Sequence, residues 1–413
     1  MKICLISEEF PPETGWGGIG THAYNLSLAL TELGHTVHVV SRSIDGKEHI
    51  SGNGDLTIIR LLERDDDAKL LKAFSIAAPY IQKTRLIPGF SEFPLRSLRR
   101  GAAISRWLKE REPFDVIEAA DYGAEAFWCQ FFDKITVPLV IKLHTPLFLT
   151  QRFNSAPKDD FGVKIRKWME EYSVTHATRI IAPSRCLADF IAKEFRIQGI
   201  EVVPNCIDID LFSYKEKDSE KTGKTIIFAG RLERNKGVEV LARAIPIVVR
   251  ATPDVKFLFV GRDTLTAEGR GSMKNWLEGY FEGEKIRPCI EFVGDVPRTK
   301  MVGYYQRADI CVLPSLWENL PYTCLEAMSC GTPVVASRVG GFPEIITEGV
   351  DGLLFESGNH EDLAEKIIKI TESEDLIELG KKARRKIENT FNHKIIAEKT
   401  IDLYNSVMRD KDA

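Results

Sequence analysis

The chain has 413 residues, of which 44% are hydrophobic and 28% are charged, and its formal net charge is −4. This composition is typical of a globular protein of roughly two or three domains, and the charge excludes a whole-molecule affinity for nucleic acid. The eight cysteines form no C-x-x-C pair, so we expect free thiols in a reducing compartment. Because no apolar run reaches 18 residues, no membrane span is expected.

Short apolar runs in the first half predict buried parallel strands. The first run, residues 2–7, is too short for a signal peptide, and a loop rich in Pro and Gly follows it. A helix is expected from Thr21 to about Gly34, whereas residues 43–55 and 64–100 show no clear pattern. The remaining predicted strands of this half are 35–41, 56–62, 114–119, 138–144, 179–183 and 200–203.

The second half repeats the alternation of strands and helices after a polar segment, 213–224, that we interpret as an interdomain linker. Its predicted strands are 226–230, 255–261, 290–294, 309–313 and 333–337, and its predicted helices start near Gly237 and cover 272–283, 298–307, 322–330 and a tail from 359 to 409. We therefore expect an α/β protein of two Rossmann-like, doubly wound domains, 1–206 and 207–413, that face each other across a cleft. The last helix could pack back on the first domain.

Two carboxylates stand out in the stretch 312–336, where Glu318 follows a predicted strand and Glu326 lies on the helix after it. Ligands of open parallel sheets bind at the carboxyl ends of the strands, and the first amides of a helix favour an anion. The stretch thus offers donors for a phosphate and acceptors for hydroxyls, as a sugar nucleotide requires. The alternative is that both glutamates are solvated surface acids.

The sequence E-N-L-P-Y-T-C-L-E at 318–326, followed by G-T-P-V-V-A, resembles the E-x7-E signature of the family-4 retaining glycosyltransferases, which have the GT-B fold. The resemblance implies that the first domain binds the acceptor and the second binds a nucleotide sugar. It implies that Glu318 contacts the donor sugar and that Glu326 binds the ribose. Further contacts to sugar and phosphate would come from the backbone of Asn319, Leu320, Pro321 and Tyr322.

Two cations follow another predicted strand, in G-R-L-E-R-N-K-G at 230–237. Arg231 and Lys236 beside a helix start would neutralise a diphosphate, Arg as a planar fork and Lys as a point charge. The same family has this pattern, which implies that both residues contact the donor diphosphate and assist its departure. Arg234 has no counterpart in the pattern, and we expect it to be solvated.

Gly15, Gly17 and Gly20 form a literal G-x-G-x-x-G. A dinucleotide fingerprint would place its first glycine directly after the strand, and here seven residues intervene. An NAD(P)-dependent oxidoreductase built on this loop remains an alternative. The resemblance instead implies that bare backbone at Gly17 and Gly18 approaches the donor phosphate.

A histidine, His144, ends the predicted strand V-I-K-L-H-T-P. It could be a satisfied core residue, whereas the family often has a histidine here beside the donor sugar, and we include it among the active-site residues. Related sequences also have a histidine-containing motif where this chain reads D-V-I-E-A-A-D, at 115–121. Glu118 or Asp121 could face the acceptor there, and neither is assigned.

No metal or other cofactor is expected. Asp208-Ile209-Asp210 is a literal D-x-D, which holds a metal in other glycosyltransferases, but this fold type binds its diphosphate with Arg and Lys. We therefore expect Asp208 to fix a turn, together with Asn205. Residues 340–344 and 351–352 also match turns of the family, with a donor contact from Glu344 as one option.

A basic segment, 83–111, has eight basic and two acidic residues, a net charge of +6, with apolar residues between them. It could dock on an anionic membrane or hold a lipid-linked acceptor, and it could equally be the solvated face of a helix.

Together these features predict a hexosyltransferase that moves a sugar from a nucleoside diphosphate donor, UDP first, to an acceptor hydroxyl with retention. The acceptor would be a sugar, a lipid-linked molecule or a small molecule, in bacterial polysaccharide, glycolipid or glycoside synthesis. We expect the protein in the cytoplasm or at the inner face of the membrane. A nucleotide-sugar epimerase or hydrolase, or an inactive sugar-nucleotide sensor, would also fit these features.

Overall fold

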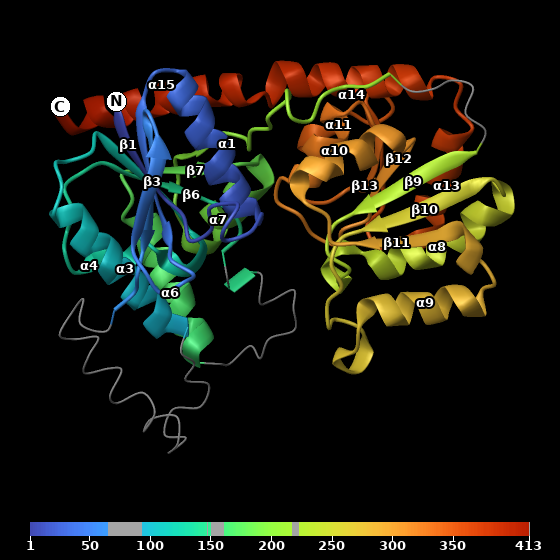
Figure 1. Ribbon diagram of the computed structural model, residues 1–413, viewed down its shortest axis with the longest axis horizontal. Coiled ribbons are helices and arrows are strands. Elements are labelled where there is room, and N and C mark those ends of the chain that lie inside the picture. The colour runs from blue at the N-terminus through green and yellow to red at the C-terminus, as the bar shows by residue number, and fades with distance from the viewer. Residues whose placement is uncertain (65–92, 147, 150–160, 217–222, 413) are drawn as a thin grey trace. The chain divides into compact units, whose positions relative to one another are not determined.

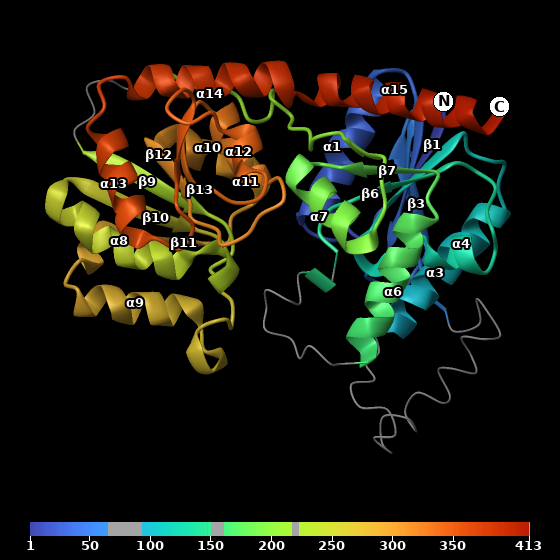
Figure 2. The same ribbon diagram turned by 180° about the vertical axis from the view of Figure 1, so that it is seen from behind.

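The computed structural model describes residues 1–64, 93–146, 148–149, 161–216 and 223–412. The chain forms two compact units, Met1–Cys206 with Ile396–Ala413, and Ile207–Ile395. Each unit has a parallel or mostly parallel sheet with helices on both faces (Figures 1 and 2). The prediction of an α/β fold with two Rossmann-like domains is confirmed. Within the described residues, no helix combines the length and apolar character needed to cross a bilayer.

The sheet of the first unit has the strand order β3-β4-β2-β1-β5-β6-β7-β8. Its strands are parallel except β3, which pairs antiparallel with β4. The strand order reverses between β1 and β5, and such a switch point is where open sheets bind ligands. The strands are β1 (Lys2–Ile6), β2 (Thr36–Arg42), β3 (His49–Asn53), β4 (Leu56–Leu61), β5 (Val116–Ala120), β6 (Leu139–Lys142), β7 (Arg179–Ala182) and β8 (Ile200–Val202).

Helices α1 (Gly18–Glu32) and α15 (His393–Asp412) pack on one face of this sheet, against side chains such as Leu5 and Val39. On the other face, α3 (Phe93–Lys109) brings Trp107 to His38. Helix α1 starts three residues before the predicted Thr21, because Gly17 serves as its N-cap. The other helices that the structure describes in this unit are the short turn η2 (Tyr122–Ala124), α4 (Phe127–Phe131), α6 (Phe161–Thr175) and α7 (Arg185–Phe195).

The second unit has six parallel strands in the order β11-β10-β9-β12-β13-β14, with its switch point between β9 and β12. Alternate residues of the strands supply two cores: Phe228 and Val312 face α8, α9 and α13, whereas Ala229 and Leu313 face α10, α11 and α14. The strands are β9 (Lys224–Ala229), β10 (Val255–Val260), β11 (Ile290–Gly294), β12 (Ile310–Leu313), β13 (Val334–Ser337) and β14 (Gly352–Phe355). The helices are α8 (Val238–Ala251), α9 (Met273–Gly283), α10 (Arg298–Arg307), α11 (Tyr322–Ser329), α12 (Phe342–Ile345), α13 (His360–Thr371) and α14 (Leu376–Thr390), with short turns η3 (Arg234–Lys236), η4 (Glu268–Arg270) and η5 (Arg287–Cys289).

One prediction about a connection was wrong. Ile207 and Phe212 are fully buried in the second unit, so the junction precedes the polar segment 213–224 that we interpreted as the linker. Within that segment, 217–222 lie outside the described residues. The predicted helical tail is three helices, α13, α14 and α15, and the last of them packs in the first unit from Ile396 onward. Strands β3 and β14 were not predicted.

Candidate active site

The loops that follow β9 and β12 leave neighbouring strand ends at the switch point of the second sheet. They also contact each other, because the amide of Leu316 donates to the carbonyl of Asn235 over 2.8 Å. Gly237 has φ +68°, and a Cβ there would lie 1.8 Å from the carbonyl oxygen of Pro314. Only glycine therefore permits this approach of the two loops.

The predicted charged residues Arg231, Lys236 and Glu318 lie on these two loops. Lys236 Nζ forms an ion pair with Glu318 Oε1, which also accepts a hydrogen bond from Ser315 Oγ over 3.1 Å. Arg231 follows β9 on the same loop as Lys236, and its half-exposed guanidinium contacts Glu233 Oε1 at 2.9 Å. The structure thus brings a lysine and a carboxylate into contact at the carboxyl ends of these strands, and the half-exposed Arg231 lies on the same loop as the lysine.

A glycine pair supports the Glu318 loop from its other side. A Cβ on Gly340, whose φ is +55°, would come within 1.5 Å of the Glu318 carbonyl oxygen, and a Cβ on Gly341 within 1.9 Å of the Asn319 carbonyl oxygen. Of the predicted turn 340–344, residues 340–341 form the turn and hold the backbone of Glu318 in place, whereas 342–344 lie on the short helix α12. Glu344 lies beyond the turn on α12 and is exposed.

The second predicted glutamate, Glu326, is buried on α11 with two partners from α10. Arg298 Nε donates to Glu326 Oε1 over 3.2 Å, and the Tyr305 hydroxyl donates to Oε2 over 3.1 Å. Burial raises the pKa of Glu326, and the guanidinium and the phenol oppose that rise. The sequence offered no motif that marks Arg298 or Tyr305.

The segment between the two glutamates leads into α11. Asn319, Leu320 and Pro321 are buried, Tyr322 is half-buried, and Pro321 is the N-cap of the helix. The first turn of α11 contains no acidic residue that would offset the positive end of the helix dipole. An anion is therefore favoured at this helix start.

In the first unit, His144 follows β6 and its backbone is fixed by a neighbouring strand end. The amide of His144 donates to Asp121 Oδ1 over 2.9 Å, and its ring meets the ring of His22 edge-on, with centroids 5.1 Å apart. Burial, His22 and Lys142 hold the pKa of His144 well below its ordinary value. A cavity of about 10 Å³ is lined by Ser7, His22, Glu118, Lys142 and His144, among others.

Glu118 and Asp121, to which the sequence assigned no role, are both buried. Glu118 contacts His22 and Tyr404, and Asp121 supports the His144 backbone. Burial raises the pKa of Asp121 to about 7, although backbone amides oppose the rise. Neither carboxylate lies at the surface, where an acceptor would meet it.

The two glycines that were predicted to approach the donor phosphate, Gly17 and Gly18, have different surroundings. Space next to Gly18 is open, whereas a Cβ on Gly17 would lie 2.0 Å from Glu9 Oε2. Residues 7–16 separate β1 from the N-cap Gly17, so the loop lacks the short strand-to-helix turn of a dinucleotide site.

The D-x-D residues form a turn. Asp208 Oδ1 accepts hydrogen bonds from the amides of Asp210 and Leu211, at 3.0 and 2.9 Å. These bonds account for the aspartate at 208 as an Asx turn. Metal-independent activity stays a prediction.

The described part of the basic segment 83–111 is largely paired within its own unit. Arg100 and Arg106 each contact a glutamate at 2.6 Å, and Lys109 contacts Asp133 at 2.5 Å. Residues 83–92 lie outside the described residues.

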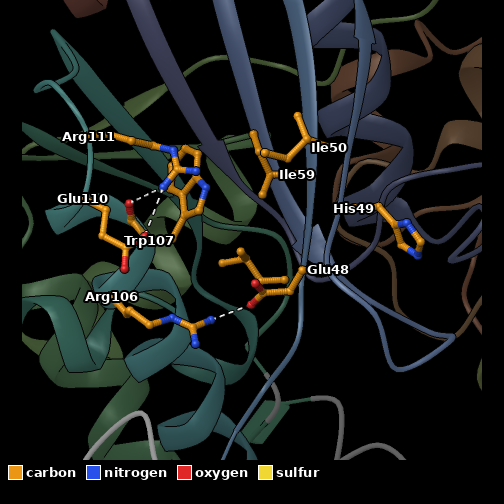
Figure 3. A pocket seen from close by; sticks show the side chains of 9 residues that line it. Glu48, His49, Ile50, Ile59, Arg106, Trp107, Glu110 and Arg111 are labelled. Atoms are coloured by element: carbon orange, nitrogen blue, oxygen red, sulfur yellow. Dashed lines mark hydrogen bonds and ion pairs between the residues drawn. The ribbon is translucent and has the colours of Figure 1, made fainter.

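A pocket of about 160 Å³ lies between β3, β4 and the end of α3, where Arg106 reaches Glu48 and Arg111 reaches Glu110 (Figure 3). Its charges neutralise one another, so we assign it no part in the site.

Comparison with known proteins gives the family. Residues 16–211 match the model described as Glycosyltransferase Family 4, and residues 212–393 match the one described as Glycosyl transferases group 1. A glycogen synthase of Mycobacterium tuberculosis is 26% identical over 99% of this chain and 95% of its own.

Solved structures share the fold. Sucrose-phosphate synthase from Thermosynechococcus elongatus superposes with a TM-score of 0.79 at 22% identity, over 99% of both chains. HepE of Anabaena, solved with UDP-glucose, superposes with a TM-score of 0.67 at 18% identity, over 98% of this chain and all of the other. With both halves matched by family models and the fold shared end to end, the chain belongs to glycosyltransferase family 4 and is a GT-B glycosyltransferase.

Proposed function

We propose that this enzyme transfers a hexose-type sugar from a nucleoside diphosphate sugar, with UDP as the first candidate, to an acceptor hydroxyl with retention. The observation that supports it best is the Lys236–Glu318 ion pair on the loops that follow β9 and β12, with Arg231 on the same loop as Lys236. A lysine and an arginine at that edge suit a diphosphate, and the adjacent carboxylate suits sugar hydroxyls.

In this proposal the diphosphate binds Arg231 and Lys236, and the sugar hydroxyls donate to Glu318. The ribose hydroxyls donate to Glu326, whose oxygens have lone pairs beyond the two bonds from Arg298 and Tyr305. Backbone groups of 319–322 complete the donor contacts. His144, Gly17 and Gly18 of the first unit are proposed to act on the same donor, as the family resemblance implies.

The chemistry breaks the bond between the anomeric carbon and the phosphate oxygen and forms a bond from that carbon to the acceptor oxygen. Negative charge develops on the leaving diphosphate, where Arg231 and Lys236 stabilise it. The departing phosphate oxygen takes the acceptor's proton on the same face of the sugar, so the anomeric configuration is retained.

The acceptor is proposed to be a hydroxyl of a sugar, a lipid-linked molecule or a small molecule. For a lipid-linked acceptor, the basic segment 83–111 would lie against the bilayer. Co-sedimentation with anionic and neutral vesicles tests that arrangement, since only anionic vesicles should retain the protein at low salt.

A thermal-shift panel tests the donor. UDP, GDP, ADP and their sugar conjugates are added with and without EDTA, and one nucleotide series should raise the melting temperature by about 5 °C at a hundredfold excess over its Kd. The shift should survive EDTA and disappear in Arg231→Met. If none of the nucleotides shifts the transition, the proposal is wrong. Turnover of the donor without an acceptor would identify a hydrolase or epimerase instead.

A further inference from the structure

Three buried polar side chains in the first unit form a chain of contacts that ends at His144. Tyr404 of α15 donates to Glu118 Oε2 over 2.8 Å, and Glu118 Oε1 contacts His22 Nε2 at 3.0 Å. The ring of His22 then meets the ring of His144. Tyr404, Glu118 and His22 have at most 4% of their surface exposed. They come from α15, β5 and α1, and Tyr404 and Glu118 are 286 residues apart in the sequence.

We propose that Tyr404 and Glu118 are positioning residues, which hold His22 in one orientation and thereby fix the imidazole of His144 in the active site. The inference rests on the proposed function in one respect, namely that His144 faces the donor sugar. It assigns to the C-terminal helix a part in the reaction that no motif of the sequence indicated.

The charges along these contacts define the direction of the hydrogen bonds. Burial by itself raises the pKa of Glu118, but His22, Lys142 and Tyr404 bring it below its ordinary value, so the carboxylate is ionised. Burial and that carboxylate raise the pKa of Tyr404, which keeps its proton and donates. An ionised Glu118 also requires a proton on Nε2 of His22, since a carboxylate only accepts.

His22 is thereby limited to one tautomer. Burial lowers its pKa, so the ring is neutral and, with the proton on Nε2, its Nδ1 is unprotonated. Nδ1 is buried and has no hydrogen-bond partner among the residues that the structure describes. Among the described residues, the hydrogen bond that orients the His22 ring is therefore the one between Nε2 and Glu118.

The contact with His144 transmits this constraint. The two rings meet at an interplanar angle of 66°, a favourable edge-to-face arrangement. The Asp121 carboxylate holds the His144 backbone, but a backbone bond does not fix χ1 and χ2 of the ring. The His22 ring supplies a side-chain restraint, and small misplacements of a catalytic group have large effects on rate.

The test uses Tyr404→Phe, which removes only a hydroxyl, with Thr400→Val as a control on the same helix. Thr400 is also buried, and its hydroxyl donates to the carbonyl of Ile396 outside the chain of contacts. The readouts are kcat and donor KM for glycosyl transfer, and the ¹⁵N shifts of the imidazole nitrogens, assigned with His22→Gln and His144→Gln.

We expect Tyr404→Phe to lower kcat about tenfold with donor KM nearly unchanged, and to shift the ring signals of both histidines. Thr400→Val should change neither. If Tyr404→Phe does not fold, Glu118→Gln takes its place with the same expected result. Combined with His144→Gln, Tyr404→Phe should have no further effect on residual turnover.

Wild-type ring signals in Tyr404→Phe would overturn the inference, and so would a tenfold loss that persists in the His144→Gln background. Failure of the proposed function looks different. In that case no variant and no wild-type protein transfers sugar, while the ring signals still report whether Tyr404 orients His22 and His144.

Discussion

The two units hold their candidate site residues in opposite ways. In the second unit, Arg231, Lys236 and Glu318 stand on loops, and the side chain of Arg231 is half exposed. In the first unit, His22 and Glu118 are buried and reach His144 through side-chain contacts. We propose that this difference reflects two tasks: the second unit meets charge on a ligand, whereas the first holds one imidazole still.

The largest expected effect concerns the exposed charges. Arg231→Met should lower kcat/KM by about 100-fold or more with little change in stability, because a half-exposed guanidinium contributes mainly to the developing charge on the diphosphate. Steady-state kinetics with a denaturant melt measures both. Arg234→Met is the matched control, since Arg234 lies on the same loop and contacts Glu239 at 3.2 Å. Equal losses of kcat/KM in the two variants would contradict the role that the comparison of the two units gives to Arg231.

Next in size is the buried ion pair between Arg298 and Glu326. Arg298→Met leaves the Glu326 carboxylate buried without its cation, which should destabilise the protein by about 3 kcal/mol. A urea titration measures the loss. Adding Glu326→Gln should restore most of it, because the uncompensated charge is gone, and no restoration would mean that Arg298 acts through packing over Phe212 instead.

The third prediction concerns pH and the first unit. The pKa of Asp121 is raised from 3.8 to about 7 in the folded protein, so folding favours the protonated acid. The resulting contribution to the free energy of unfolding, measured relative to Asp121→Asn, is complete below about pH 4. It is lost as the pH rises to about 7. Asn keeps the acceptor for the His144 amide. Between pH 5 and pH 8 the variant should gain about 2.5 kcal/mol over the wild type, and a pH-independent difference would show that Asp121 titrates normally.

The smallest effect is expected at a hydroxyl. Tyr305→Phe removes one of the two hydrogen bonds to Glu326 and leaves the ion pair, so it should cost about 1 kcal/mol. The same urea titration measures it. A loss as large as that of Arg298→Met would mean that the phenol, and not the guanidinium, compensates the buried carboxylate.

The candidate residues of the second unit could be chosen from the sequence because they lie in short local patterns. Lys236 and Glu318 each follow a strand that could be recognised by its apolar run, and parallel strand ends lie at one edge. Tyr404 and Arg298 could not be found in that way. They reach Glu118 and Glu326 from helices that only tertiary packing brings near, and each helix shows an ordinary amphipathic pattern.

The same distinction explains the errors in the fold. Most strands and helices were predicted, because apolar runs and helical periodicity are local signals. Strand β3 was missed because all five of its residues are exposed and one is glycine, so nothing in its pattern marks a strand. The segment 213–224 was interpreted as the linker because a polar composition marks exposure to water, whereas the two units divide after the buried Cys206, where the predicted domain ranges also divide.

The central claim is tested most directly by a structure of the enzyme in complex with a nucleoside diphosphate. The ligand to use is the one that gives the largest thermal shift. The account predicts the diphosphate against Arg231 and Lys236, with the ribose at Glu326 and with Glu318 free to meet a sugar. A nucleotide bound elsewhere, with the Lys236–Glu318 pair untouched and Arg231 still on Glu233, would contradict it.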